Sequence, residues 1–374
     1  MKRADLIRVS VFLVAAAALF LLPRLPFVND FRAQQFAYVG IYFIALLGLN
    51  LLTGITGQIS LGHGAFMLIG GYTTAILMSD QQLKIGSHVF ASDMRDIWTI
   101  PLAGLVAGIV GFLFGFPALR LAGLYLALAT FAVAVAAPAV VKKFDGFTGG
   151  GGGINLFDLS TRTQSTSVTD PVTFESKDGG IDILGINIPT FNEWLYYLCW
   201  TIALVLFGVA WLLLRGRFGR TLRAVRDSEL AAASSGVNLA RYKTLAFGVS
   251  AFYAGVAGSL LAIATTFVNP DTFPITLSIF LLVGVVVGGL GSLWPLVFGA
   301  IFIHFMQIEW AQRVEAIIPN WLPVLGDIDT DAPGAPAVAF GVILILIMLA
   351  FPGGAAGLLA SLKSLATRGY HRAR

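Results

Sequence analysis

Long apolar runs constrain the fold of this chain more than any other feature of its sequence. Each run is long enough, or nearly so, to cross the hydrocarbon core of a bilayer as a helix, which takes about 20 residues. A segment inside lipid has to satisfy its own backbone hydrogen bonds, so the runs predict helices. Ten such runs occur: Leu6–Leu22, Phe36–Leu52, Ile55–Met78, Trp98–Phe116, Leu119–Val141, Trp194–Leu214, Tyr242–Phe267, Pro274–Leu290, Leu293–Met306 and Ala337–Phe351.

The runs predict an all-α, polytopic membrane protein of about ten transmembrane or re-entrant helices, forming a single transmembrane domain over residues 1–374. Several runs are short or interrupted by glycine, and such runs can be re-entrant segments that line a cavity. The composition agrees, because 57% of the residues are hydrophobic and only 12% are charged. A soluble domain of this length could not bury so much apolar surface. The first run begins like a signal peptide, but its small-residue cleavage candidates lie inside it, so we expect it to be retained.

The distribution of charge predicts the orientation of the chain. With Met1 in the cytoplasm, the segments on that side hold 15 Lys and Arg against three acidic residues, and the other side holds nine against 17. Basic residues gather on the cytoplasmic side of membrane proteins. We therefore expect both termini and the loop at residues 215–243 to be cytoplasmic, and the loop at residues 142–193 to be extracytoplasmic. The net charge of +4 has this topological explanation and does not indicate a nucleic-acid partner.

The loop at residues 215–243 is the longest polar segment with a helical pattern, and it carries seven of the 24 basic residues. Thr221 is a candidate N-cap, Gly236 is placed to end the helix, and Asn238 could cap the next one. The simpler interpretation is a surface helix that lies on anionic lipid and has no protein partner. Its mixed charges and its small residues from Ala231 to Gly236 favour a helix that docks on another protein.

Several kinds of chemistry are missing from the sequence. It has no phosphate loop ending in Gly-Lys-Ser/Thr, no His-Glu-x-x-His, no Gly-x-Ser-x-Gly and no Cys/His cluster. We therefore expect no catalytic role and no cofactor of its own. The charged residues within the runs, Arg8, Arg120 and Lys243, lie near their ends, whereas ion-coupled carriers keep ionisable groups at membrane depth. The energy for any transport would then come from a partner, although an ATP-independent channel or secondary carrier stays an alternative. A membrane enzyme is disfavoured.

His63 is the candidate titratable group at membrane depth in the first half of the chain, within a glycine-rich segment that also offers Gln58 and Ser60. These side chains could bind a polar solute, or they could satisfy backbone groups freed where a helix breaks. A packing histidine is the blander alternative. His304 lacks such surroundings and is expected to be structural. In the run after the polar loop, small residues recur every fourth position and predict close helix packing: Ala246, Ser250, Ala254, Gly258 and Ala262.

In combination, several motifs resemble the LivM-type permease subunit of branched-chain amino acid ABC importers. The motifs are TGITGQISLGHGAF at 53–66, RLAGLYLALAT at 120–130, TGGGGGI at 148–154, GRTLRAVRDSELAAASSG at 219–236, VVGGLGS at 286–292 and FPGG at 351–354. The resemblance covers nearly the whole chain apart from the long loop at 142–193. Two departures are visible. Leu230 occupies the glutamate position of the general ABC-permease pattern Glu-Ala-Ala-x-x-x-Gly, with Glu229 displaced by one, which resembles this family's own variant of the pattern. The stretch of about 158–188 is longer than expected for the family.

The resemblance implies a non-catalytic subunit in a bacterial-type inner membrane. Its implied partners are a second homologous permease, two cytoplasmic ATPases that bind the ATP and magnesium, and an extracytoplasmic solute-binding protein. A substrate route is implied at Gln58, Ser60, His63, Gly64, Thr148 and Gly149. Contacts that couple the chain to the ATPases are implied at Arg220, Arg223, Arg226, Asp227, Glu229, Ala231, Ala232 and Gly236. Permeases for urea and short-chain amides resemble the chain through the same motifs, so urea or a short-chain amide is the alternative solute.

Overall fold

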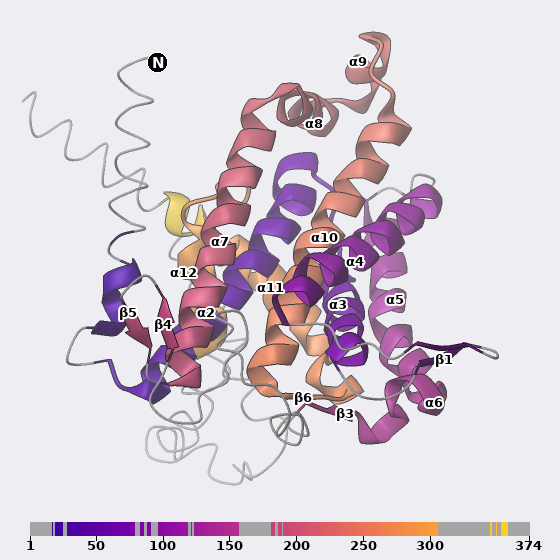
Figure 1. Ribbon diagram of the computed structural model, residues 1–374. Helices are drawn as coiled ribbons and strands as arrows, with labels where there is room; N and C mark the ends of the chain where they lie inside the picture. The colour runs from indigo at the N-terminus through magenta and orange to yellow at the C-terminus, as the bar shows by residue number, and fades with distance from the viewer. Residues whose placement is uncertain are drawn as a thin grey trace, which may run out of the picture.

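The computed structural model describes residues 28–78, 96–118, 123–156 and 190–305, with shorter pieces at 17, 19–24, 83–85, 88–90, 121, 181–183, 186–188, 345, 349 and 353–357. These residues form a helical bundle (Figure 1). The chain order is η1 (Leu22–Arg24), α2 (Asp30–Leu49), η2 (Asn50–Ile55), α3 (His63–Met78), β1 (Leu83–Ile85), β2 (His88–Phe90), α4 (Asp96–Ala118), α5 (Leu124–Lys143), α6 (Asp145–Thr148), η3 (Gly150–Gly152), β3 (Ile154–Asn155), β4 (Ile181–Ile183), β5 (Ile186–Ile188), α7 (Phe191–Arg215), α8 (Arg217–Asp227), α9 (Glu229–Ser234), α10 (Leu239–Thr265), β6 (Phe267–Val268), η5 (Pro270–Thr272), α11 (Ile275–Gly288) and α12 (Leu296–Phe305).

Six helical stretches among the described residues are long and apolar enough to cross a membrane: Asp30–Ile55, Ile97–Ala118, Leu124–Lys143, Phe191–Arg215, Leu239–Thr265 and Pro270–Gly288. The helices α3 and α12 are apolar but shorter. Eight of the ten predicted runs coincide with a described helix. The first and last runs lie largely outside the described residues, as does most of the predicted extracytoplasmic loop, so the count of about ten stays a prediction.

The centre of the bundle is built on α2 and α10, the most deeply buried of these helices. The helix α10 packs on α3, α4 and α2, and α2 packs in turn on α7 and α12. The helices α4, α5 and α7 leave large apolar side chains exposed at the periphery, such as Leu113, Leu128 and Leu212. Apolar residues on all sides of a helix are expected where its outer surface meets lipid.

The face of α10 that carries small residues packs closely against other helices, as predicted. Ala246, Ser250, Ala254 and Ala262 are buried. A Cβ added to Gly258 would lie 1.9 Å from the carbonyl oxygen of Met67 on α3. Such contacts let two helix backbones approach, which is how small residues stabilise helix pairs in membranes.

The boundary predicted between the second and third runs is wrong in detail. The second helix does not end at Leu52, because α2 continues through the π-helical turn η2 to Ile55. The next helix begins only at His63, not at Ile55. The intervening glycines explain the shift, since Gly57 has a φ of 74°, a conformation that ends a helix and that favours glycine.

The two ends of the bundle differ. The helices α8 and α9 lie together at one end, and the short sheet of β3 and β6 lies at the other (Figure 1). In that sheet Ile154 pairs with Val268, and close by Lys142 contacts Asp271 through an ion pair of 2.9 Å. The sheet therefore ties the glycine-rich segment after α5 to the end of α10.

Candidate functional site

The break between α2 and α3 is the most irregular part of the bundle interior. Gly54 has no room for a side chain, because a Cβ there would lie 2.0 Å from the Asn50 Oδ1 and 2.6 Å from the Gly291 backbone nitrogen. The chain leaves helical geometry at Gly57, which has a positive φ, and runs without helix to Gly62 before α3 begins. We call residues 50–62 the broken-helix junction. A π-turn followed by non-helical backbone is common at functional sites.

Side chains from other helices satisfy the backbone groups that the junction frees. The Leu61 backbone N–H donates to the Thr130 hydroxyl on α5 at 2.9 Å. The Gly64 N–H donates to the Ser278 hydroxyl on α11, also at 2.9 Å. Irregular backbone inside a membrane protein needs such partners. We did not single out Thr130 or Ser278 as site residues from the sequence; an isolated hydroxyl within an apolar run was the available signal.

Asn50 connects the junction to the turn between α11 and α12. Its Nδ2 donates to the Ser292 carbonyl oxygen at 3.0 Å, and its Oδ1 accepts from the Gly291 N–H at 2.8 Å. The side chain is fully buried. These two hydrogen bonds therefore tie together two glycine-rich turns that are about 230 residues apart in sequence.

His63 is buried and bonded to the backbone of the preceding helix. Its Nε2 lies 3.1 Å from the Ala45 carbonyl oxygen, and the ring is buried at the start of α3. Ser60 is also fully buried, with its Oγ 3.4 Å from the Gly62 N–H. His304 is likewise held, by a hydrogen bond to Gln35 and by stacking on Tyr38. Gln58 differs, because its buried Oε1 has no hydrogen-bond partner among the described residues.

The implied substrate-route residues fall into two groups. Gln58, Ser60, His63 and Gly64 belong to the junction and the start of α3. Thr148 is the last residue of α6 and Gly149 follows it. The helix α6 lies at the end of the bundle that carries β3 and β6 (Figure 1). There the Thr148 hydroxyl donates to the Val141 carbonyl oxygen at 2.8 Å, and Gly149 adopts a φ of 69°. The structure therefore does not gather the six residues into one site.

The polar loop forms two helices where one was expected. Thr221 is not an N-cap, since it lies inside α8 and its hydroxyl donates to the Arg217 carbonyl oxygen at 3.0 Å. Ser228 breaks the helix and caps α9, accepting from the Ala231 N–H at 3.2 Å. A serine directly before the helix-favouring run Glu-Leu-Ala-Ala-Ala is a recognisable N-cap signal that our interpretation missed.

The predicted end of this segment is confirmed. Gly236 has a φ of 82°, and the Asn238 side chain accepts from the Arg241 N–H at 3.1 Å to cap α10. Leu222 and Val225 form the buried edge of α8.

Two of the implied coupling residues are exposed but contact groups on other helices. The Arg226 Nη1 donates to the Gly54 carbonyl oxygen at 2.6 Å, which joins α8 to the broken-helix junction. The Glu229 carboxylate accepts from the Lys243 ammonium at 2.7 Å and joins α9 to α10. Arg223 bonds to the Leu214 carbonyl oxygen at 3.2 Å. Among the others, Ala232 is buried and the following are exposed: Arg220, Asp227, Ala231 and Gly236.

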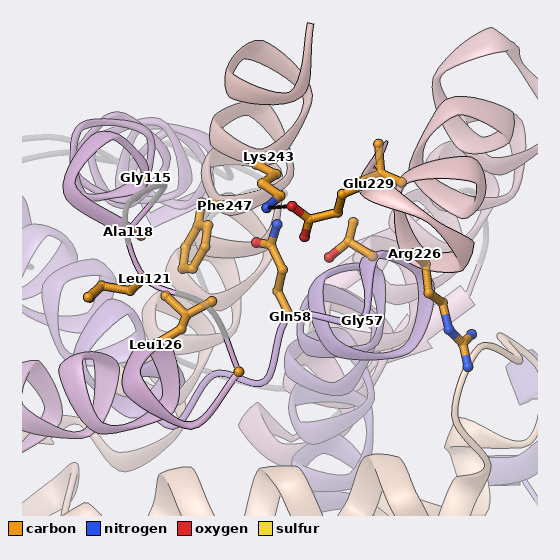
Figure 2. A pocket seen from close by; sticks show the side chains of 13 residues that line it. Gly57, Gln58, Gly115, Ala118, Leu121, Leu126, Arg226, Glu229, Lys243 and Phe247 are labelled. Atoms are coloured by element: carbon orange, nitrogen blue, oxygen red, sulfur yellow. Dashed lines mark hydrogen bonds and ion pairs between the residues drawn. The ribbon is translucent and has the colours of Figure 1, made fainter. Parts of the chain in front are cut away.

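A cavity of about 130 Å³ lies where the junction meets these helices (Figure 2). Its polar lining includes Gln58, Arg226, Glu229 and Lys243. The remaining lining residues are Thr56, Gly57, Gly115, Ala118, Leu121, Gly123, Leu126, Val225 and Phe247. The cavity thus joins Gln58, implied for the substrate route, to Arg226 and Glu229, implied for coupling. Within the described residues, no group of three His, Cys, Asp or Glu side chains is placed to hold a metal ion.

A family model matches residues 32–362 and is described as "Branched-chain amino acid transport system / permease component". The chain is 34% identical over 270 residues to the high-affinity branched-chain amino acid transport system permease protein LivM of Salmonella typhimurium, and 35% identical over 277 residues to that of Escherichia coli. Each match covers 70% of this chain and 60% of the relative, so the chain spans less than two thirds of the length of these proteins.

A more distant similarity is to the ribose import permease protein RbsC of Haemophilus influenzae, with 27% identity over 162 residues. That match covers 41% of this chain and 47% of the relative. No solved structure matches the chain significantly.

Proposed function

Because the chain belongs to the family of branched-chain amino acid transport system permease components, we propose that it is the membrane-spanning subunit of an ATP-binding-cassette importer. In this proposal it moves branched-chain or related hydrophobic amino acids into the cytoplasm. The chain is a multi-pass membrane protein of a transport family, which agrees with a non-catalytic role. Hydrolysis of ATP, with its magnesium, belongs to partner chains.

The assembly that we propose has four kinds of component: this chain, a second homologous permease, two cytoplasmic ATPases and an extracytoplasmic solute-binding protein. The ATPases contact α8 and α9. The α8–α9 end is therefore cytoplasmic in our proposal, and the β3–β6 end faces the solute-binding protein. The complex lies in an inner membrane. The charge asymmetry of the sequence supports the orientation.

One observation carries the mechanism: the 2.6 Å hydrogen bond from Arg226 to the Gly54 carbonyl oxygen. A bond between a charged donor and a backbone carbonyl is strong and sensitive to geometry. A push on α8 is therefore transmitted to the broken-helix junction, and from there through Asn50 to the turn between α11 and α12. Alternating access follows if ATP closure favours one arrangement of this linked unit and ATP release favours the other.

The names of the relatives support a branched-chain amino acid as the solute over urea or a short amide. The apolar part of the cavity, formed by Leu121, Leu126 and Phe247, also suits an aliphatic side chain. Gln58 is the substrate-route residue that offers an unpaired polar atom. Ser60 and His63 have partners, so in our proposal they hold the junction in shape and Gln58 meets the solute.

The test is uptake by the purified complex in liposomes, with labelled L-leucine, L-isoleucine, urea and acetamide supplied with the solute-binding protein. We expect accumulation of the two amino acids that requires both ATP and the ATPase subunits. Accumulation of urea or acetamide alone would establish the alternative solute class. Uptake by the permease without ATP or ATPases would overturn the importer proposal in favour of a channel or secondary carrier.

A further inference from the structure

The cavity between the broken-helix junction, α9 and α10 contains an unused hydrogen-bonding group. Gln58 is only 8% exposed, and its Oε1 has no hydrogen-bond partner in the described part of the chain. Its backbone is fixed, because its carbonyl oxygen accepts from the Thr53 hydroxyl at 3.2 Å. Figure 2 shows the side chain directed toward the Lys243–Glu229 pair. A buried carboxamide oxygen without a partner is costly, so a donor from a bound molecule would stabilise it.

The charges around the cavity are of both signs. Lys243 and Glu229 form an ion pair of 2.7 Å at its edge, and Arg226 also lines it. A simple anion would meet the Glu229 carboxylate, and a simple cation would meet Lys243 and Arg226. A small molecule that carries an ammonium and a carboxylate close together can satisfy both signs at once.

Apart from Thr56, the rest of the lining carries no polar side chain. Ala118, Leu126 and Phe247 are buried in the bundle and face this space, and Leu121 lies beside them. The volume of about 130 Å³ is close to that of a core cavity that holds benzene, which is about 150 Å³. The space therefore fits a compact aliphatic group and is too small for a nucleotide.

We propose that this cavity binds a zwitterionic amino acid with a small aliphatic side chain, which enters from the α8–α9 end and slows the transport cycle. The ammonium group contacts Glu229 and the Gln58 carboxamide oxygen, and the carboxylate contacts Lys243. Glu229 is the first residue of α9, so the occupant holds α9 against α10 and restrains the segment that the ATPases would move. This inference rests on the proposed function, in which that end is cytoplasmic and the solute meets Gln58 in the same cavity on its way in. Solute that has accumulated in the cytoplasm then rebinds there, and the imported solute becomes its own inhibitor.

Binding is tested on the full chain, purified in lipid nanodiscs without partners, with labelled L-leucine as the probe. Lys243→Met removes the ammonium group that contacts the carboxylate of the bound leucine, and Leu126→Trp fills the cavity. We expect each to weaken leucine binding by at least about tenfold, the loss of one charge-assisted contact. The matched controls are Arg241→Met and Leu128→Trp, whose side chains are exposed on the same two helices and do not line the cavity. They should bind leucine within about twofold of the wild-type affinity.

Competition with leucinamide, which lacks the carboxylate, and with 4-methylpentanoate, which lacks the ammonium, tests the zwitterion directly. Each should compete at least about tenfold less well than leucine. This measurement needs no variant, so it holds even if Leu126→Trp fails to fold. Equal competition by either analogue, leucine binding unchanged in Lys243→Met, or no leucine binding at millimolar concentration would overturn the proposal.

The regulatory effect is tested in vesicles that contain the whole complex, with L-leucine added only in the compartment of the ATPases. We expect the initial rate of ATP-driven uptake to fall with this leucine, and to fall less in Lys243→Met than in Arg241→Met. Uptake that is insensitive to this leucine overturns the regulatory part. A wild-type complex with no ATP-driven leucine uptake would refute the proposed function instead. The two failures are distinguishable, because leucine binding to the chain in nanodiscs is measured without transport.

Discussion

At the scale of single residues, the side chains with the clearest mechanical role are polar groups that bind backbone atoms far away in sequence. Arg226 binds the Gly54 carbonyl oxygen and Asn50 binds both Gly291 and Ser292. The residues that stood out in the sequence for their chemistry, His63 and Ser60, are engaged in local packing. The sequence identified Arg226 through a family resemblance, but nothing in its pattern indicated the carbonyl group that it contacts.

Replacing Arg226 should uncouple ATP hydrolysis from uptake. Arg226→Gln loses a charge-assisted hydrogen bond to the Gly54 carbonyl oxygen, an interaction of about 1.5–3 kcal/mol. We expect the rate of uptake by the reconstituted complex to fall at least about tenfold while ATP hydrolysis continues. Binding of solute by the separate receptor should be unchanged.

Arg217→Gln serves as the matched control, since Arg217 is exposed on the same helix. Uptake per ATP hydrolysed is the quantity to measure in both variants. An Arg226→Gln complex with the wild-type ratio would show that α8 does not act through Gly54.

Replacing Asn50 should destabilise the fold. Asn50→Leu leaves the Gly291 N–H and the Ser292 carbonyl oxygen without this partner in a buried site, at about 1–3 kcal/mol for each group. The midpoint of thermal unfolding in detergent should fall clearly. Asn192→Leu, at an exposed hydrogen bond to Asp30, should change stability by no more than about 0.5 kcal/mol. Equal midpoints for the two variants would contradict the bridging role of Asn50.

At the scale of helices, close approach between backbones decides how the bundle packs. The crossing of α3 and α10 is so tight that Gly70 and Gly255 also meet, with 2.1 Å between a Cβ added to Gly70 and the Gly255 carbonyl oxygen. The repeat of small residues along α10 predicted such a contact. Which helix it would meet was not predictable, because small-residue faces occur on several helices of the chain.

A methyl group on Gly258 should therefore be damaging. Gly258→Ala places its Cβ 1.9 Å from the Met67 carbonyl oxygen, and backbone atoms cannot move aside easily. We expect a loss of stability of about 1–3 kcal/mol, the usual cost of overpacking. Gly208→Ala in α7 is the matched control, since a Cβ there meets nothing within 4 Å, and it should be neutral or slightly stabilising. Chemical or thermal denaturation of the two purified variants makes the comparison.

At the scale of the whole molecule, the two ends of the bundle have different partners in our proposal, and the orientation in the membrane decides which is which. The charge distribution predicts that α8 and α9 are cytoplasmic and that the glycine-rich segment before β3 is extracytoplasmic. The native cysteine, Cys199, is fully buried, so a cysteine introduced at the surface can be labelled selectively.

Labelling of introduced cysteines tests this orientation. In intact cells, a membrane-impermeant maleimide should label Gly151→Cys, which is exposed and has open space around it. Ser234→Cys, exposed at the end of α9, should react only after the membrane is permeabilised. The opposite pattern would invert the topology and place α8 and α9 away from any cytoplasmic ATPase.

The sequence by itself determined the class of the protein, most of its helices and the end of its polar segment. It did so because membrane helices need long apolar runs, and because caps such as Gly236 and Asn238 act on their immediate neighbours. Only the tertiary structure decided how the broken-helix junction is satisfied and what Arg226 contacts. Those interactions join residues separated by 69 positions, for Leu61–Thr130, to 242 positions, for Asn50–Ser292. No local pattern records such pairs, because their geometry arises only when the helices pack.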